Sequence, residues 1–281
     1  MKLQTTAKIN MAALIKLLQQ NRMKHFRAHI PIVIEKKNFI VKTADSKEEL
    51  FAALKLRHDV FISELLKKSK RSGMDKDRFD KLCDHLIIID KRDGKLIGTY
   101  RLQSSLYTKK WYTATEFHMK MIKRLPGVKL ELGRACVHPD HRNGITIALL
   151  WEGISAYIEA SGTNYLFGCS SIKTTDREEI KSIYYYLLQN GHLSHEHRVT
   201  PKGKFKVPGM KRQIKVLPEW EEEISHLYMK DKIPSLLNSY LKVGAKVCGS
   251  PALDRSFKCI DFLTLLDVNS MKAERIRKPR D

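Results

Sequence analysis

Short apolar segments alternate with amphipathic segments along this chain, and this alternation limits the folds that it can adopt. Apolar segments of strand length lie at residues 38–43, 85–90, 95–102, 130–138, 164–172 and 257–266. Between most of them, apolar residues recur every three or four positions, as on one face of a helix. Strands that alternate with helices predict an α/β protein with one mixed central sheet flanked by helices.

The clearest local patterns are one hairpin and one helix start. His85–Asp90 (HLIIID) and Lys95–Leu102 (KLIGTYRL) flank Arg92-Asp93-Gly94, and Asp-Gly between two apolar segments is typical of a hairpin turn. Ser46 is followed three residues later by Glu49, which is a capping box. We therefore expect an antiparallel hairpin, preceded by a helix that begins at Ser46.

Further elements are expected nearer the two ends. Thr175 with Glu178 predicts another capped helix, and Lys211–Leu217 predicts a strand. Residues 11–26 have apolar residues on one helical face and basic residues around it. Such a helix can lie on an anionic membrane or dock on the protein's own core.

Basic residues are concentrated in a few segments. The formal net charge is +21, and residues 1–42, 198–215 and 271–281 carry +8, +7 and +3 of it. Basic segments attract an acidic partner, such as a phospholipid surface, an acidic carrier protein or a nucleic acid. We expect residues 1–37 to be a basic amphipathic extension, residues 38–270 a single catalytic domain, and residues 271–281 a basic tail.

Membrane-spanning and metal-binding patterns are missing from the sequence. It contains no run of 18 apolar residues, and Lys16 splits the one apolar run near the start, which argues against a secretory signal. The five cysteines show no CxxC or Cys/His metal spacing. These features predict reduced thiols in a cytoplasmic protein.

The strongest functional pattern is a strand, a tight turn and a helix between Glu131 and Trp151. The turn contains Arg142, Asn143 and Gly144. The first amides of a helix have no internal partners and can hold a phosphate, and glycine lets the phosphate approach the backbone. The alternative is an ordinary turn before a helix.

This unit resembles the acyl-thioester site of the GNAT N-acyltransferases. In that superfamily, a Gln/Arg-x-x-Gly-x-Gly/Ala loop holds the pyrophosphate of coenzyme A. The chain reads His141-Arg-Asn-Gly144-Ile-Thr146, so the motif is kept only in part, as suits a donor with a single phosphopantetheine phosphate. The resemblance implies one GNAT-type domain, whose mixed sheet has splayed strands around the pantetheine arm.

A narrower resemblance covers roughly residues 40–270. The chain is similar to the ornithine N-acyltransferases of bacterial ornithine-lipid synthesis, and its layout also resembles acyl-homoserine-lactone synthases. The matching stretches are Leu56–Phe61, Phe79–His85, Gly98–Leu102, Glu131–Pro139, Leu166–Ser170 and Tyr240–Gly249. The resemblance implies transfer of a (3-hydroxy)fatty acyl group from acyl carrier protein to the α-amine of ornithine, giving lyso-ornithine lipid. It also implies no cofactor, no metal and no nucleic acid. We expect a cytoplasmic protein, and the basic N-terminal helix could hold it at the inner face of the membrane.

The expected catalytic residues are Glu131 and Arg134. An amine must lose a proton to attack a thioester, and Glu131 is expected to take it, directly or through water. A kinked strand at Ala135–Val137 would present backbone N–H groups to the oxyanion. Arg101 or Arg134 could clamp the carboxylate of the acceptor.

The resemblance implies two further groups of residues. The substrate-binding residues would be Arg57, Phe61, Asp77, Asp80, Asp84 and Arg101. The residues that bind the phosphopantetheine of the donor would be Cys136, Val137, Arg142, Asn143, Gly144, Ile145 and Thr146. Outside these groups, Lys202–Arg212 is expected to steer the acidic carrier protein.

Structural roles and other functions remain open. Glu131 and Arg134 could form an ion pair, and Arg57 and Arg101 could pair with Asp77 or Asp80 to fix the loop. The enzyme could use acyl-coenzyme A or another amine such as glycine or lysine, or be a lactone synthase. A basic nucleic-acid-binding protein is a further alternative, although the sequence shows no RNP, zinc-finger or helix-turn-helix pattern.

Overall fold

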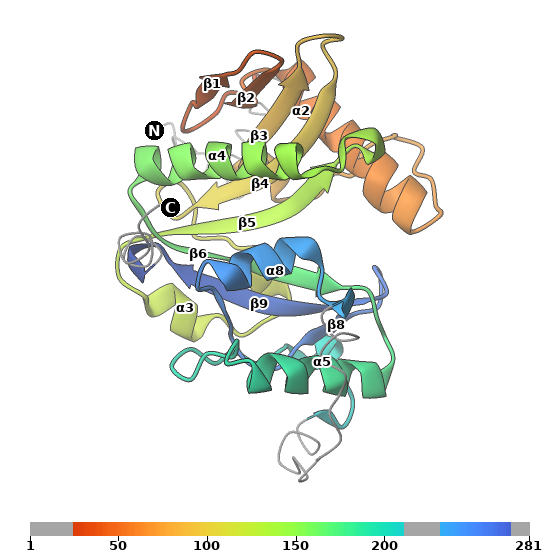
Figure 1. The fold of residues 1–281 in the computed structure, drawn as a ribbon, viewed down its shortest axis with the longest axis vertical. Coiled ribbons are helices and arrows are strands. Elements are labelled where there is room, and N and C mark those ends of the chain that lie inside the picture. The colour runs from red at the N-terminus through yellow and green to blue at the C-terminus, as the bar shows by residue number, and fades with distance from the viewer. Residues whose placement is uncertain (1–24, 211–230, 271–281) are drawn as a thin grey trace, which may run out of the picture. The chain divides into compact units, whose positions relative to one another are not determined.

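The computed structural model of the protein describes residues 25–210 and 231–270 (Figure 1). The chain divides into two compact units. The first comprises Met1–Leu102 and Arg134–Tyr157, and the second comprises Gln103–Gly133 and Ile158–Asp281. No helix among the described residues combines the length and the apolar character needed to cross a bilayer.

In the first unit, four strands pair in antiparallel fashion in the order of the chain. They are β1 (Val33–Glu35), β2 (Phe39–Thr43), β3 (Asp84–Asp90) and β4 (Leu96–Ser104). β3 and β4 form the expected hairpin, with Ile87 opposite Thr99. The edge strand β1 is an element that the sequence pattern did not predict.

Helices cover both faces of these strands (Figure 1). Ile87 of β3 packs with Leu50 and Leu54 of α2 (Lys47–Arg57). The neighbouring Leu86 points to the other face, where α4 (Gly144–Ser161) lies so close that a Cβ on Gly153 would stand 2.7 Å from its side chain. The alternation of β3 side chains therefore anchors a helix on each side of the sheet.

The start of α2 is the predicted capping box. The Ser46 hydroxyl accepts a hydrogen bond from the Glu49 amide at 3.1 Å, and the Glu49 carboxylate accepts one from the Asp45 amide at 2.7 Å. After α2, the chain continues as a π-helix, η1 (His58–Leu65). Lys67 then has a left-handed backbone with φ of 52°.

In the second unit, the strands form a mixed sheet. β5 (Val128–Val137) runs parallel to β6 (Thr163–Ile172), with pairs from Val128↔Thr163 to Glu131↔Phe167. β6 is antiparallel to β9 (Cys259–Asp267), which also pairs with β7 (Lys246–Val247) and β8 (Ala252–Asp254). The prediction of a mixed α/β sheet is confirmed.

Helices of the second unit also pack on two faces. Phe262 of β9 joins a core cluster with Ile183 of α5 (Arg177–Gln189) and Leu237 of α8 (Ser235–Lys242). The adjacent Leu263 joins a different cluster with Ile122 of α3 (Lys120–Arg124).

One predicted helix start is displaced, and three predicted segments lie wholly or mostly outside the described residues. The predicted cap at Thr175 is wrong by one residue, because Asp176 caps α5 by accepting from the Glu179 amide at 2.8 Å. A carboxylate at this position also interacts favourably with the helix dipole. The strand expected at residues 211–217 and almost all of the helix expected at residues 11–26 lie outside the described residues, as does the tail 271–281.

Candidate active site

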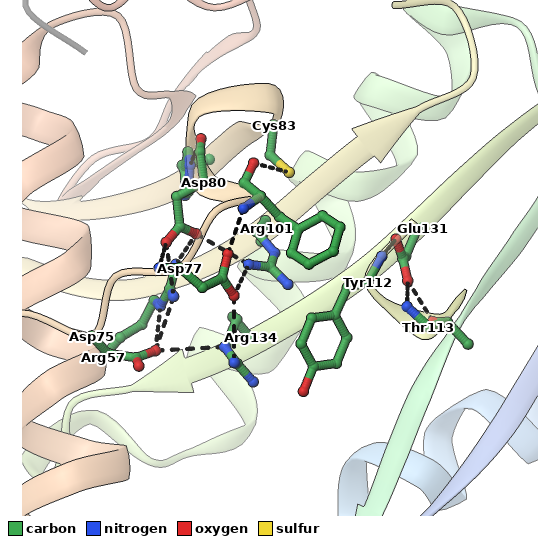
Figure 2. A network of polar contacts seen from close by, with 12 residues as sticks. Arg57, Asp75, Asp77, Asp80, Cys83, Arg101, Tyr112, Thr113, Glu131 and Arg134 are labelled. Atoms are coloured by element: carbon green, nitrogen blue, oxygen red, sulfur yellow. Dashed lines mark hydrogen bonds and ion pairs between the residues drawn. The ribbon is translucent and has the colours of Figure 1, made fainter. Parts of the chain in front are cut away.

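Three arginines and three aspartates form one polar network in the first unit (Figure 2). They come from the end of α2, the loop before β3, the short 3-10 helix η2 (Asp80–Leu82), β4 and β5. The members are Arg57, Asp75, Asp77, Asp80, Arg101 and Arg134. Their formal charges cancel, which is the condition for burying so many ionised groups together.

Arg57 lies at the centre of the network. It is fully buried, and its guanidinium donates to Asp75 Oδ2 at 2.9 and 3.1 Å and to Asp80 Oδ1 at 2.7 Å. Burial alone would raise the pKa of Asp80, but the charges of Arg57 and Arg101 outweigh it and hold this pKa well below its usual range. Asp80 is therefore ionised at neutral pH.

Arg101 of β4 shares Asp80 with Arg57 and adds Asp77 to the network. Its Nη1 donates to Asp77 Oδ2 at 2.7 Å and to Asp80 Oδ1 at 3.1 Å, and the Asp77 amide donates to Asp80 Oδ2 at 2.7 Å. Arg57 and Arg101 thus pair with these aspartates and fix the loop, which is the structural one of the two roles expected for them. Their role in binding substrate stays a prediction.

Arg134 combines an unusual backbone with a looser set of contacts. Its φ is 54°, a left-handed conformation that a non-glycine residue in a strand adopts at a cost of about 1–2 kcal/mol. Its guanidinium lies 3.5 Å from Asp75 and 3.5 Å from Asp77. The kink expected at Ala135–Val137 thus begins one residue earlier, and the aspartates hold its side chain.

Two predicted substrate residues lie outside this network. Asp84 is buried, and its carboxylate accepts from the His29 amide at 2.8 Å, the Ile30 amide at 3.1 Å and the Tyr157 hydroxyl at 2.8 Å. Phe61 is half-buried on η1 and packs against Val60, Cys136 and their neighbours. The structure therefore gives Asp84 a set of partners that fixes the segment before β1.

Cys136 and Val137, the first two residues predicted to bind the acyl donor, lie at the end of β5. The Cys136 thiol is buried, lies 3.7 Å from the Leu56 carbonyl, and has a pKa that burial raises to about 12. It is thus a thiol at neutral pH and a poor nucleophile. The Val137 carbonyl accepts from Arg142 Nε at 3.3 Å.

The other residues predicted to bind the acyl donor lie in the turn before α4 and in the first turn of that helix. Asn143 Oδ1 accepts from the Thr146 amide at 3.0 Å and from its hydroxyl at 3.2 Å. A Cβ built on Gly144 would meet no atom within 4 Å, and Ile145 is 63% exposed. Arg142 forms a two-pronged ion pair with Glu64 of η1 at 2.7 and 2.5 Å. The predicted turn and helix start are confirmed, with open space beside the glycine.

Glu131 belongs to the second unit, where donors from one short turn surround its carboxylate (Figure 2). Oε1 accepts from the Thr113 amide at 2.5 Å and from the Thr113 hydroxyl, and Oε2 accepts from the Tyr112 amide at 2.8 Å. The residue is only 4% exposed. Three donors fix the orientation of this carboxylate in the core of the unit.

A family model described as an acetyltransferase (GNAT) domain matches residues 56–152. This segment is identified as a GNAT domain, and the chain is an acyltransferase. All of the predicted site residues, from Arg57 to Thr146, lie within the matched segment.

Most of this chain is also similar to relatives named L-ornithine N(alpha)-acyltransferase. It is 29% identical to the L-ornithine N(alpha)-acyltransferase of Rhizobium meliloti, over 83% of this chain and 81% of the relative. It is 28% identical to the enzyme of the same name from Agrobacterium fabrum, over 84% of this chain and 83% of the relative. The predicted resemblance to ornithine N-acyltransferases is confirmed.

A solved structure with a similar fold is that of an N-acyl amino acid synthase from uncultured soil microbes. The TM-score is 0.46 at 9% identity, over 85% of this chain and 96% of the other.

The sequence reasoning missed a buried acidic cluster in the second unit of the acyltransferase. Carboxylate oxygens of Glu116, Asp254 and Asp261 lie within 4.8 Å of one another, and all three residues are buried. Oxygen ligands of this kind suit Mg²⁺ or Ca²⁺. Burial, and then the charge of Asp261, raises the pKa of Glu116 to about 8. The one available signal was an acidic residue, Asp261, inside an apolar strand.

This cluster predicts a pH dependence of stability. An unfolded Glu116 ionises near its ordinary pKa, so between about pH 4.5 and 8 the native chain binds more protons than the unfolded chain. The free energy of unfolding should therefore fall as the pH rises through this window, by a few kcal/mol as an order of magnitude. Glu116→Gln should remove most of this fall in urea denaturation at pH 6 and pH 8.5. The exposed Glu196→Gln is the control, and an unchanged slope in Glu116→Gln would contradict the assignment.

Proposed function

We propose that this acyltransferase moves a (3-hydroxy)fatty acyl group from acyl carrier protein to the α-amine of ornithine, giving lyso-ornithine lipid at the inner face of the bacterial membrane. The observation that carries the proposal is the similarity, over 83–84% of the chain, to four enzymes named L-ornithine N(alpha)-acyltransferase. The GNAT domain supplies the reaction type, which is attack of an amine on an acyl thioester.

The geometry favours Arg134 over Arg101 as the group that binds the carboxylate of the acceptor. Arg101 is 3% exposed and holds Asp77 at 2.7 Å, so its guanidinium is committed to the network. The Arg134 side chain is 16% exposed and lies 3.5 Å from each of its aspartates. A two-pronged guanidinium–carboxylate contact would be shorter and stronger than these.

Two groups support the chemical step. Glu131 takes the proton of the attacking amine, directly or through water, from an orientation that Tyr112 and Thr113 fix. Backbone N–H groups in Ala135–Val137, after the left-handed residue, stabilise the oxyanion that develops on the thioester carbonyl. Collapse of this intermediate breaks the C–S bond, and the phosphopantetheine of the carrier leaves as a thiol after taking up a proton. Direct aminolysis of a thioester needs no metal and no cofactor.

The donor phosphate is assigned to the start of α4. The first amides of a helix have no partner within the helix and attract anions. The Thr146 amide already donates to Asn143 Oδ1, so the phosphate is assigned to the amides of Gly144 and Ile145, where the side of Gly144 is open. Arg142, in the same turn, is already paired with Glu64 and fixes the turn against η1. One phosphate, as in a phosphopantetheine arm, fits a turn in which His141 and Thr146 replace two positions of the pyrophosphate-binding motif.

The test is product identification. The purified protein is incubated with 3-hydroxyacyl carrier protein or with the matching acyl-coenzyme A, and with ornithine, lysine, glycine or buffer alone, and products are identified by mass spectrometry. We expect an acyl-ornithine amide from the carrier-protein donor, with modification at the α-amine. Acylation of another amine, or a product from coenzyme A alone, would refute the corresponding half of the proposal.

A further inference from the structure

A basic surface with exposed apolar side chains lies beside the first turn of α4, and we propose that acyl carrier protein docks on it. The loop surface, as we call it, consists of Leu65, Lys67, Lys68, Arg71 and Ile145. The inference rests on the proposed function, because it assigns the place where the carrier that delivers the thioester binds.

Backbone contacts hold the basic loop in place at the end of η1. The Lys68 amide donates to the Ile62 carbonyl at 2.9 Å, and the Lys70 amide donates to His58 Nε2 at 3.2 Å. His58 is itself buried. The backbone that carries these cations is therefore held in place, so that less backbone entropy is lost when a partner binds.

An ion pair joins this loop to the donor site. The two bonds between Arg142 and Glu64 connect the last turn of η1 with the turn before α4, and Figure 1 shows the end of the orange helix next to the start of α4. The loop surface thus borders the amides assigned to the donor phosphate.

The charge available to a partner is positive. Arg142 neutralises Glu64, and Lys70 pairs with Asp75 at 3.4 Å. Within the described parts of the chain, no carboxylate lies within ion-pair distance of the exposed Lys67, Lys68 and Arg71. The one exposed acid in the turn before α4 is Asp140, which lies 3.7 Å from His138.

Apolar side chains accompany these cations. Leu65 is 47% exposed and Ile145 is 63% exposed, and few other large apolar side chains in the described residues are as open. Isolated exposed apolar residues need no explanation, but cations interspersed with apolar anchors are the composition expected of a docking site for an acidic protein.

The chemistry of the donor favours a carrier protein over a lipid surface here. In acyl carrier protein, the phosphate of the phosphopantetheine arm is attached directly to the protein. When that phosphate lies at the start of α4, the carrier must contact the rim around it. The loop surface is part of that rim, so its cations and its apolar side chains would both contact the carrier.

The test is a charge reversal, Lys68→Glu with Arg71→Glu, compared with Lys109→Glu with Lys110→Glu. The control replaces two exposed lysines of the second unit. In the loop variant we expect KM for the acyl carrier protein to rise about tenfold or more, with kcat and KM for acyl-pantetheine unchanged. Anisotropy of labelled holo-carrier protein should show the same loss of binding, and the control should show neither.

Several results would overturn the inference. KM for the carrier could stay unchanged in the loop variant, or rise equally in the control. Sedimentation with anionic vesicles could be lost in the loop variant while KM for the carrier is unchanged, which would assign the surface to the membrane. If acyl carrier protein serves as donor but these variants bind it normally, only the docking site fails. If the wild type does not use it at all, the proposed donor and the docking site fail together.

Discussion

Replacing Glu131 by glutamine should lower turnover by ~10²–10⁴-fold if its carboxylate accepts the proton of the attacking amine. The substitution keeps the size of the side chain and removes its charge. It also replaces one carboxylate oxygen, which accepts a hydrogen bond from the Tyr112 or the Thr113 amide, by an NH₂ group. One backbone N–H would then face another hydrogen-bond donor. The loss of activity must therefore be separated from a local structural effect.

Two measurements make this separation. If Glu131 is the base, the acidic limb of the pH profile of kcat/KM should disappear in Glu131→Gln, whereas a purely structural role would leave that limb in place. Thr113→Val removes one donor to the carboxylate without removing the carboxylate, and it should lower stability more than turnover. Near-normal turnover in Glu131→Gln would remove Glu131 from the catalytic step.

Regular patterns in the sequence were sufficient to predict the local elements that position the site residues. The hairpin from β3 to β4 follows from alternating apolar residues around Asp93-Gly94, and the start of α2 follows from Ser46 and Glu49. The turn into α4 follows from Asn143 and Gly144. Each of these depends on interactions between residues that are near one another in the chain, so a single sequence contains the necessary information.

Long-range partnerships could not be predicted in the same way. The pair of Arg57 and Asp80, 23 residues apart, was expected only as one of two alternatives. The contact of Glu116 with Asp261, 145 residues apart, was not expected at all, because nothing in either local sequence specifies the partner. The resemblance grouped Asp84 with Asp77 and Asp80 as substrate-binding residues, but the Asp84 carboxylate in β3 accepts hydrogen bonds from His29 and Tyr157 instead. The π-helix η1 also lacks a local signal, since its amphipathic spacing resembles that of an α-helix.

Replacing Asp80 by alanine should lower the free energy of unfolding by about 3–5 kcal/mol, because it leaves two buried guanidinium groups short of one negative charge. Arg57 and Arg101 are 0% and 3% exposed, so water cannot replace the missing carboxylate. Asp80→Asn should be nearly as destabilising, since it keeps the shape and removes the charge. Urea denaturation at pH 7 measures both, with the exposed Asp93→Ala, which breaks a surface pair with Lys95, as a control expected to change stability much less than either substitution of Asp80.

The pH dependence of the same contribution has a defined sign. The folded pKa of Asp80 is lowered by Arg57 and Arg101 against the opposing effect of burial, so this contribution is complete above the ordinary aspartate pKa and is lost as the pH falls below it. The difference in stability between wild type and Asp80→Asn should therefore shrink below about pH 4. A double-mutant cycle with Arg57→Ala should give a large coupling energy, because each single substitution leaves its partner buried and unpaired. If Asp80→Ala lay within 1 kcal/mol of the wild type, the network would not be the element that holds the loop.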